Sequence, residues 1–269
     1  MANHQLRVLD AHGTPSARFR AACEAGEAGY VHSHENGSAF DGPGLRYVLW
    51  TTGCLMRCPY CHNPDTWNTL NGKASTVDEV LTDAARFAPF LRAAGGGFTV
   101  SGGEPLSQDR FAVRLLRGAR GLGLHTALDT NGFLGRRLSD DELEEIDLFL
   151  LDIKSFLPGV HRRATGVEVG PVLDFARRLD AQQRPAWVRF VLVPGLTDDA
   201  ENVAGLAEFV ASLGNVERVQ VLPFHQMGRF KWEKLGLDYT LDDTPEATAE
   251  QAEAVREVFR AARVRHVAA

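Results

Sequence analysis

The chain has 269 residues, of which 44% are hydrophobic and 24% are charged, and its net charge is −6 at neutral pH. This length and composition fit one large globular α/β domain or two small ones. The acidic balance leaves no basic surface for nucleic acid, and no apolar run approaches the ~20 residues of a membrane-spanning helix.

Residues 1–28 carry no clear signal for a helix or a strand. They show no sustained periodicity and are rich in Ala, Gly, His and Arg, so we predict a flexible or loosely packed extension. The start of the chain also lacks the basic and apolar regions of a signal peptide, so we expect a cytoplasmic protein. No linker or internal repeat divides residues 29–269, which we predict to form one domain.

Six short runs of β-branched and aromatic residues follow, and a helical pattern separates each run from the next. The runs lie at residues 45–52, 97–102, 124–130, 147–154, 186–193 and 216–224. Strands that alternate with helices form βαβ units, so the sequence predicts a parallel sheet.

The segments between the runs carry helix-start signals. Segment 75–79 contains a capping box, and Asp198 with Glu201 repeats the pattern. Helices at these places can cover one face of the sheet. Six βα units are too few for the eight-stranded barrel of about 250 residues, so we predict an open, partial barrel. A flat, doubly wound sheet is the alternative.

Three of the four cysteines, Cys54, Cys58 and Cys61, have the spacing C-x3-C-x2-C in a loop-like segment. Thiolates are the usual ligands of iron–sulfur clusters, and three of them leave one iron of a four-iron cubane open to a cofactor or substrate. A zinc site is the alternative, with His62 or Cys23 as the only nearby fourth ligand. A disulfide would need an oxidising compartment. We interpret Cys23 as an incidental free thiol.

Polar residues follow the runs at the point where each strand leaves the sheet. In α/β barrels the loops after the strands converge on one mouth, where the chemistry takes place. The candidates are Cys54, Ser101, Gly102, Gly103, Glu104, Asp129, Thr130, Asn131, Asp152, Ile153, Lys154, Arg189 and His225. Each alone has a structural explanation, such as a turn or a helix cap. Together they predict one polar site beside the cysteines.

The chain also contains seven distinctive phrases: FDGPGLRYV, GCLMRCPYCHNPDTW, SGGEPL, LDTNGF, LDIK, VRFVLVPGLTDD and NVERVQVLPFHQMGRFKW. They resemble the radical S-adenosylmethionine (SAM) enzymes and, within them, the activating enzymes of pyruvate formate-lyase. The cysteine motif marks the whole superfamily, whereas the other phrases are specific to the activating enzymes. The resemblance covers about residue 29 to the carboxyl terminus. It implies a TIM-like, partial (β/α)6 barrel with a [4Fe-4S] cluster on the three cysteines.

The resemblance further implies the chemistry. In the family, the open iron binds SAM, and an electron from the reduced cluster cleaves SAM into methionine and a 5′-deoxyadenosyl radical. This radical removes a hydrogen atom from a glycine of pyruvate formate-lyase, and its reactivity requires a dry, enclosed mouth. The implied electron donor is a protein such as flavodoxin or ferredoxin, and we expect the enzyme to be a monomer.

Residue roles are implied where this sequence matches the family. Cys54, Cys58 and Cys61 are the implied cluster ligands. Lys154 is expected to neutralise the SAM carboxylate, and Arg189 to make a second polar contact, with an ion pair to a strand-end acid as its alternative. The other implied cofactor contacts are Tyr60, Cys61, His62, Gly102, Gly103, Glu104, Asp152, Ile153 and His225. The glycines would let the backbone approach SAM closely, and bracing of the loop is the alternative for Glu104.

Two strand-end carboxylates, those of Asp129 and Asp152, would repel each other at one site unless a proton or a cation lay between them. The resemblance implies a monovalent cation held by Asp129, Thr130 and Asp152, and helix capping is the alternative. Asp41 is an implied contact for the glycine loop of the partner, with a structural turn as its alternative.

Other functions remain open on sequence alone. The chain could activate a different glycyl-radical enzyme, such as a dehydratase, a decarboxylase or the anaerobic ribonucleotide reductase. Activators of the first two usually carry a cysteine-rich insert, which this chain lacks, and activators of the reductase are generally shorter. A non-catalytic zinc or iron–sulfur scaffold is a further alternative, against which the SGGE, LDIK and LPFH segments speak.

Overall fold

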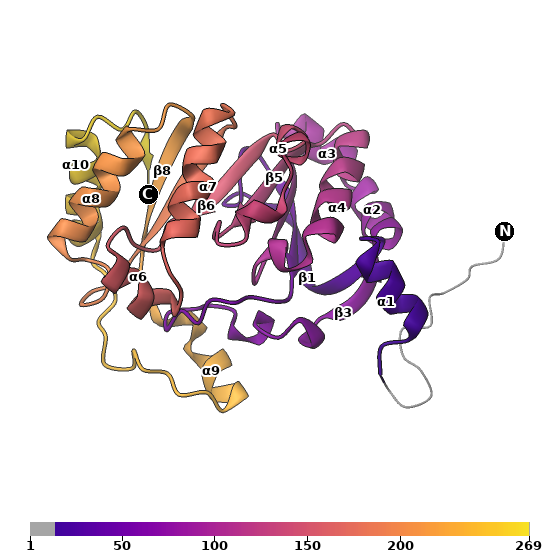
Figure 1. Ribbon diagram of the computed structural model, residues 1–269, viewed down its shortest axis with the longest axis horizontal. Coiled ribbons are helices and arrows are strands. Elements are labelled where there is room, and N and C mark those ends of the chain that lie inside the picture. Colours follow the sequence, from indigo (N-terminus) through magenta and orange to yellow (C-terminus); the bar gives the residue numbers. More distant parts are fainter. Residues whose placement is uncertain (1–13, 269) are drawn as a thin grey trace.

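The structure, a computed structural model, describes residues 14–268, and nine strands form one open sheet at its centre (Figure 1). Their order across the sheet is β3-β1-β2-β4-β5-β6-β7-β8-β9. The strands are β1 (Ala28–Ser38), β2 (Arg46–Thr51), β3 (Lys73–Thr76), β4 (Gly97–Gly102), β5 (His125–Thr130), β6 (Leu148–Asp152), β7 (Ala186–Leu192), β8 (Val216–Pro223) and β9 (Val267–Ala268). Because β3 and β9 are two separate edges, the sheet does not close on itself.

Helices cover the outer face of this sheet, and α9 lies apart from them at one end of the molecule (Figure 1). The helices are α1 (Ala17–Glu24), α2 (Val77–Ala85), α3 (Ala88–Ala93), α4 (Asp109–Gly121), α5 (Asp140–Glu144), α6 (Pro158–Thr165), α7 (Gly170–Ala181), α8 (Ala200–Ala211), α9 (Arg229–Leu235) and α10 (Ala249–Ala261). Five short 3-10 turns are η1 (Pro64–Thr66), η2 (Thr69–Asn71), η3 (Pro105–Gln108), η4 (Gly135–Arg137) and η5 (Gln226–Gly228). No helix in residues 14–268 is long and apolar enough to cross a membrane.

The six predicted strands are β2, β4, β5, β6, β7 and β8, and neighbouring strands in this group pair in parallel. The predicted partial barrel is therefore confirmed. Three strands were not predicted. Strand β1 pairs antiparallel with β2 and with β3, and its burial pattern is irregular. A half-exposed antiparallel strand gives a weaker sequence signal than a buried parallel one.

Hydrophobic side chains separate into two layers because neighbouring residues of a strand point to opposite faces. The main core lies between the sheet and its helices, and it includes Phe149 of β6 and Phe175 of α7, whose rings pack edge to face at 5.9 Å. A small separate cluster contains Ala127, Leu148 and Leu150 of β5 and β6. The concave face of the sheet is thus only partly filled by apolar groups, which leaves room for polar ones.

Two helix starts test the capping predictions. Thr76 and Glu79 form the predicted capping box of α2, in which each side chain binds the other residue's backbone N–H. The start of α8 differs by one residue from the prediction. Asp199, not Asp198, accepts the cap bond from the backbone of Asn202. Asp198 accepts instead from the N–H of Gly195, so it closes the preceding turn.

The predicted extension at residues 1–28 lies partly outside the described residues, since the description begins at residue 14. Within the described part, α1 begins after Ser16 and buries Phe19 and Ala22. The Phe19 ring packs edge to face against that of Tyr30 on β1, with the centroids 5.4 Å apart. Loose packing is therefore not a property of this helix, whose eight residues are too few to show a clear period in the sequence.

Candidate active site at the carboxyl ends of the strands

A cavity of about 720 Å³ opens at the carboxyl ends of the parallel strands. Most of the residues predicted for the site line it: Cys54, Cys58, Tyr60, Cys61, His62, Gly102, Gly103, Asp129, Thr130, Asp152, Lys154, Arg189 and His225. Asp41 lines it as well, whereas Glu104 and Ile153 do not. The topology thus brings together residues from six strand ends.

The three cysteines lie on the loop that follows β2. The backbone N–H of Gly53 donates to the carbonyl of Thr66 at 2.7 Å, and that of Cys54 donates to Trp67 at 3.1 Å. Gly53 has a φ of +99°, a conformation that only glycine adopts without strain. These bonds pin the loop against the cavity, and all three of its thiols are free.

Burial disfavours the thiolate form of these cysteines. It raises the pKa of Cys54 to about 12, and it also raises the pKa values of Cys58 and Cys61. The nearby Lys154 ammonium favours the thiolates and opposes the shift at all three positions. A further positive charge, such as that of a metal, would be needed to ionise the thiols at neutral pH.

Lys154 and Asp152 form a buried ion pair within the cavity. The Lys154 Nζ lies 2.7 Å from Asp152 Oδ2, and the side chains are 13% and 22% exposed. Burial lowers the pKa of Lys154, but the Asp152 carboxylate outweighs this effect, so the pKa lies above its ordinary value. Nζ also lies 6.0 Å from the centroid of the Tyr60 ring. A permanent ammonium therefore faces the cavity beside the cysteine loop.

Arg189 links two carboxylates across the cavity. Its Nη1 lies 3.2 Å from Asp129 Oδ2, and its Nη2 lies 3.6 Å from Asp41 Oδ1. Burial lowers the pKa of Arg189. The nearby carboxylates, of which Asp129 has the largest effect, outweigh burial, so the pKa lies above its ordinary value. Burial also raises the pKa of Asp129, while Arg189 favours the carboxylate. Arg189 therefore forms the ion pairs that were the alternative in the sequence analysis. A polar contact between Arg189 and a ligand at the mouth stays a prediction.

These ion pairs bear on the predicted cation site. Asp129 and Asp152 already face the positive groups of Arg189 and Lys154. Thr130 Oγ1 is occupied as a donor to Glu104 at 2.7 Å. The chain therefore supplies the counter-charge that the prediction assigned to a bound cation, and the cation itself stays a prediction.

The sequence analysis explained the glycines at positions 102 and 103 by a close approach of the backbone to SAM. The structure gives another reason. A Cβ on Gly102 would lie 2.2 Å from the carbonyl oxygen of Thr51, and one on Gly103 would lie 2.7 Å from that of Gly53. Gly102 also has a φ of +137°. Close packing of the β4 end against β2 thus requires both glycines before any ligand is considered.

Glu104 lies behind the cavity, where it braces the loop. The carboxylate is 1% exposed and accepts from Leu106 N–H at 3.0 Å, Asn131 N–H at 2.8 Å and Thr130 Oγ1. Burial raises its pKa to about 7, although these hydrogen bonds oppose the shift. Ile153 is fully buried in the main core. Both residues therefore stand one layer away from the cavity.

His62 and His225 face each other at the cavity wall, with ring centroids 4.4 Å apart. Burial and the proximity of His225 lower the pKa of His62 to about 4. His62 is therefore neutral at physiological pH, and the pair offers an aromatic surface to a ligand in the cavity.

Two tryptophans that contact the cysteine loop, Trp67 and Trp232, were not predicted for the site, and the predicted strand-end residue Asn131 also lies against the loop. Trp232 of α9 donates from Nε1 to the Cys61 carbonyl at 2.9 Å and packs edge to face on Trp67 at 5.1 Å. Asn131 Nδ2 lies 3.9 Å from Cys54 Sγ. Asn131 stands at a strand end, which was the available signal, whereas nothing in the sequence connects Trp232 to a loop 171 residues away.

Comparison with known families agrees with this geometry. The family model described as the radical SAM superfamily matches residues 48–207. The chain belongs to this superfamily. Two curated relatives, the pyruvate formate-lyase-activating enzymes of Staphylococcus epidermidis and Staphylococcus aureus, are each 44% identical over 239 residues. Each match spans 86% of this chain and 94% of the relative. The resemblance stated from the seven phrases is therefore confirmed.

Two solved structures have a similar fold. A domain of a pyruvate formate-lyase-activating enzyme from Bacteroides vulgatus superposes with a TM-score of 0.53 at 25% identity, over 65% of this chain and 100% of that one. Streptococcus suis SuiB bound to S-adenosylmethionine superposes with a TM-score of 0.61 at 15% identity, over 85% of this chain and 50% of that one. The second similarity shows the fold alone.

Membership of the radical SAM superfamily implies a [4Fe-4S] cluster and SAM as cofactors, and the cavity fits both. Three free thiols on one wall are the soft ligands that an iron–sulfur cluster takes, and coordination deprotonates a thiol whatever its free pKa. The Tyr60 hydroxyl is buried without a hydrogen-bond partner among residues 14–268, so a bound group can satisfy it. Lys154 offers a fixed cation to a carboxylate.

Proposed function

We propose that this chain activates pyruvate formate-lyase by generating a glycyl radical on it. The proposal is supported by the 44% identity to activating enzymes together with one observation: three free cysteines share a cavity with the residues from the strand ends. When bound, the cluster and SAM supply a one-electron cleavage that yields methionine and a 5′-deoxyadenosyl group able to take a hydrogen atom from a glycine. The protein supplies binding, orientation and exclusion of water.

The cluster ligands in this proposal are Cys54, Cys58 and Cys61. Their loop is fixed at both ends by backbone hydrogen bonds, which holds the sulfur atoms in place. Trp232 covers the Cys61 end of the loop. A cluster bound by these three residues would be held at the wall of the cavity that the proposal assigns to SAM.

Lys154 is the proposed partner of the SAM carboxylate. The Asp152 carboxylate holds the ammonium in the cavity, so the charge is pre-organised before SAM binds. Tyr60, His62 and His225 form the aromatic and polar wall proposed for the adenosine end. The remaining proposed contacts act through the backbone or through neighbours: Gly102, Gly103, Glu104 and Ile153.

Arg189 is proposed to position the incoming glycine loop, and Asp41 is its partner in this role. The two side chains are only 11% and 18% exposed, so their ion pair lies in a partly dry wall. A charged pair held there can offer hydrogen bonds to a peptide backbone without admitting bulk water. Exclusion of water protects a carbon radical from side reactions.

A monovalent cation at Asp129, Thr130 and Asp152 is a separate part of the proposal. Such an ion would share Asp152 with Lys154 and Asp129 with Arg189. Oxygen ligands suit a hard cation, which supports the assignment. A cytoplasmic location, a monomeric state and an electron donor such as flavodoxin or ferredoxin complete the proposal.

The test uses anaerobically reconstituted protein, SAM, a chemical reductant and pyruvate formate-lyase. We expect one 5′-deoxyadenosine for each radical formed and a glycyl signal in the electron paramagnetic resonance spectrum of the partner. A second glycyl-radical enzyme, a dehydratase, is the matched control. A signal on the dehydratase alone supports the alternative partner, and absence of SAM cleavage contradicts the proposal.

A further inference from the structure

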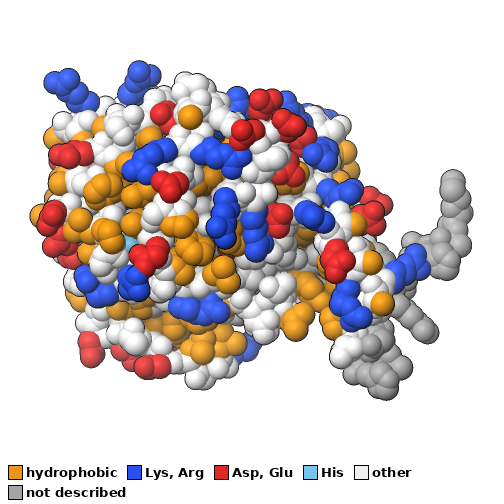
Figure 2. Space-filling view, viewed as in Figure 1, with side chains coloured by type: hydrophobic (Ala, Val, Ile, Leu, Met, Phe, Trp, Pro, Cys, Tyr) orange, Lys and Arg blue, Asp and Glu red, His pale blue; other side chains and the backbone are white. Residues whose placement is uncertain are grey.

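Helix α9 contributes no side chain to the main core. Of its seven residues, only Lys231 and Trp232 are not exposed. Phe230 and Leu235, on the same helix, are 61% and 41% exposed. Figure 2 shows hydrophobic side chains at the lower edge of the molecule, where α9 lies. The attachment of this helix to the protein therefore depends on two side chains.

Both of these side chains bind the segment that begins at the third cysteine. Trp232 is 6% exposed, and its Nε1 donates to the Cys61 carbonyl at 2.9 Å. Lys231 Nζ donates to Asn63 Oδ1 at 2.7 Å and lies 3.3 Å from Asp65 Oδ2. The only inward-facing groups of α9 thus hold consecutive parts of one turn of the cysteine loop.

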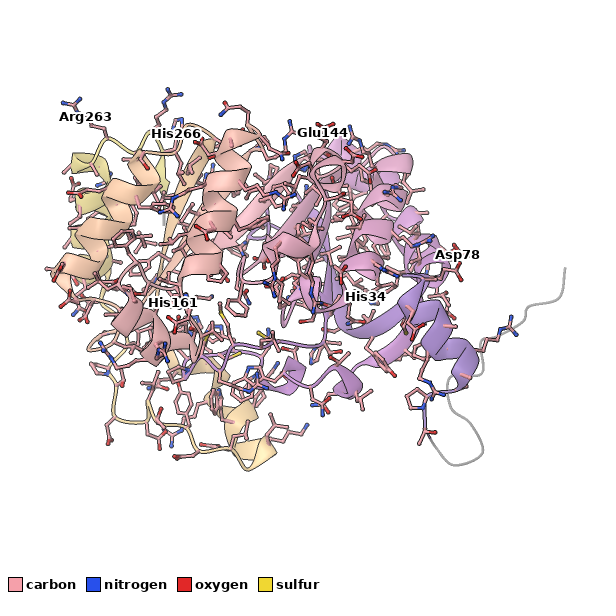
Figure 3. The ribbon with its side chains drawn as sticks, viewed as in Figure 1. His34, Asp78, Glu144, His161, Arg263 and His266 are labelled. Atoms are coloured by element: carbon pink, nitrogen blue, oxygen red, sulfur yellow. The ribbon has the colours of Figure 1, made fainter. Side chains whose placement is uncertain are left out.

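Asp65 joins this turn to the sheet as well as to α9. Its Oδ2 lies 3.0 Å from Nε2 of His32, on β1, the strand that carries the labelled His34 in Figure 3. Its backbone carbonyl accepts from Asn71 Nδ2 at 3.0 Å. Because Lys231 binds the same carboxylate, the turn is held between the sheet on one side and α9 on the other.

The contact of α9 extends to the first cysteine through Trp67. The Trp67 ring packs edge to face on Trp232 at 5.1 Å, and its carbonyl accepts from the Cys54 N–H at 3.1 Å. The approach is close at the start of the helix too, since a Cβ on Gly228 would lie 2.9 Å from His62 Cα. Segments on both sides of the cysteine motif therefore rest on α9.

We propose that Lys231 and Trp232 are positioning residues that hold the cysteine loop in the shape that retains the cluster. This inference rests on the proposed function, which assigns the cluster to the three cysteines of that loop. Loss of iron requires a ligand to move away from the metal. Groups that fix the ligands from behind oppose such movement, and partners of this kind commonly determine how tightly a metal is held.

The experiment compares the reconstituted holoenzyme variants Lys231→Met and Trp232→Phe with a matched control, Lys234→Met. Lys231→Met keeps an unbranched side chain and removes the ammonium group. Trp232→Phe keeps an aromatic ring and removes the N–H donor. Lys234 lies on the same helix, is exposed and takes no part in the contacts described above. The control therefore carries the same change of charge without loosening the loop.

The first readout is the rate at which a chelator removes iron. We expect this rate to rise about tenfold in Lys231→Met and about threefold in Trp232→Phe, because a hydrogen bond from a charged donor contributes more than one from a neutral donor. Lys231→Arg keeps the charge and should restore most of the retention. The Lys234→Met protein should match the wild type.

The second readout is the midpoint potential of the cluster, which depends on the charge around it. We expect a lower potential in Lys231→Met, because one positive charge beside the cysteine loop is lost. Lys231→Arg and Lys234→Met should keep the wild-type value, the latter because solvent screens an exposed charge. A role in the stability of α9 alone would not shift the potential.

Wild-type rates of iron release in both Lys231→Met and Trp232→Phe overturn the inference, whatever their activity. Equally fast release from Lys234→Met overturns it too. Faster release with an unchanged potential in Lys231→Met removes Lys231 from the positioning residues. A wild type that retains its cluster and forms no glycyl radical contradicts the proposed function, while the release rates still decide the inference. If Trp232→Phe does not fold, Lys231→Met and Lys231→Arg decide the result.

Discussion

Two arginines are buried inside the barrel, and their partners differ. Arg46, at the amino end of β2, is fully buried and donates to neutral groups: Thr99 Oγ1 at 3.0 Å, Phe98 O at 2.8 Å and His125 O at 3.1 Å. Arg189, nearer the mouth, faces carboxylates. Burial lowers the pKa of Arg46 to about 10, whereas the carboxylates raise that of Arg189.

The difference distinguishes the amino end of the barrel, called the closed end below, from the carboxyl end, where the cavity opens and which is called the open end. The backbone carbonyls around Arg46 cannot change their charge or leave, so this cation is a permanent part of the closed end. The carboxylates around Arg189 and Lys154 can exchange partners when a ligand with its own charges enters. We therefore expect changes at the closed end to affect stability, and changes at the open end to affect binding and chemistry.

The largest expected effect is at the open end. Cys58→Ala should abolish the cluster and the cleavage of SAM, because only three thiols share the cavity. Iron and sulfide analysis with electron paramagnetic resonance measures this loss. Cys23→Ala is the matched control and should keep the full iron content, because Cys23 lies in α1 and does not line the cavity. An intact cluster in Cys58→Ala would remove this residue from the ligand set.

Arg46→Met tests the closed end. Loss of these three hydrogen bonds from a charged donor, at about 1.5 kcal/mol each, should lower the free energy of unfolding by roughly 4.5 kcal/mol. The melting temperature should fall by roughly 10 °C. Arg189→Met should cost less stability, since Asp129 can take up a proton when its partner is lost. An equal fall in melting temperature for Arg46→Met and Arg189→Met would contradict the expected difference between the two ends of the barrel.

Glu104, which lies behind the cavity, allows a test that depends on pH. Its folded pKa of about 7 exceeds the ordinary 4.5, so the folded state binds more protons and stability falls as the pH rises from 4.5 to 7. The full shift corresponds to about 3 kcal/mol. Glu104→Gln cannot titrate, so its stability relative to the wild type should improve by about this amount between pH 5 and pH 8. Parallel pH profiles of denaturation would show that Glu104 does not titrate in this range.

Lys154→Ala should weaken SAM binding by about 1.5 to 3 kcal/mol, or roughly ten- to hundredfold, because it removes a charge-assisted contact to a carboxylate. The cluster should remain, as judged by its spectrum. Lys154→Arg is the conservative control and should not fully restore affinity, because the guanidinium is larger and planar. Wild-type affinity of the alanine variant in calorimetry would exclude the contact.

Asp41→Asn should have the smallest effect on stability, under about 1 kcal/mol, because its pair with Arg189 is long at 3.6 Å. Radical formation on pyruvate formate-lyase should fall, while SAM cleavage without the partner should persist. Both rates are measured on the same preparation. Equal loss of the two would assign Asp41 to the folding of its turn, where Ser38 Oγ already donates to Asp41 Oδ2 at 2.6 Å.

The parallel core of the fold was predictable because buried strands read as continuous apolar runs. The predicted run 97–102 coincides with β4, and 186–193 exceeds β7 by one residue. The unpredicted β1 is stabilised by one neighbouring strand on each side, β2 and β3, and only β2 was visible in the sequence. Pairing over long sequence distances overrides local propensity there.

Within the site, the expectation that functional residues follow the carboxyl ends of the strands located these residues but did not identify their partners. It placed Asp152 and Lys154 in one segment, yet it did not indicate that they pair with each other. It also attributed Gly102 to ligand approach, whereas the contact that requires it is the Thr51 backbone. Such contacts depend on the spacing between neighbouring strands, which a linear pattern does not contain.

The open sheet has a consequence for solubility. A barrel that does not close leaves two strand edges with unpaired backbone groups, which can recruit strands from other chains. Here the edge strands β3 and β9 are four and two residues long. So short an edge offers few hydrogen bonds in register to an intruding strand. These edge strands also pair with only Ala28–Val31 of β1 and two residues of β8, so the longer part of each outer edge lies on β1 and β8 and has no strand of residues 14–268 paired to it.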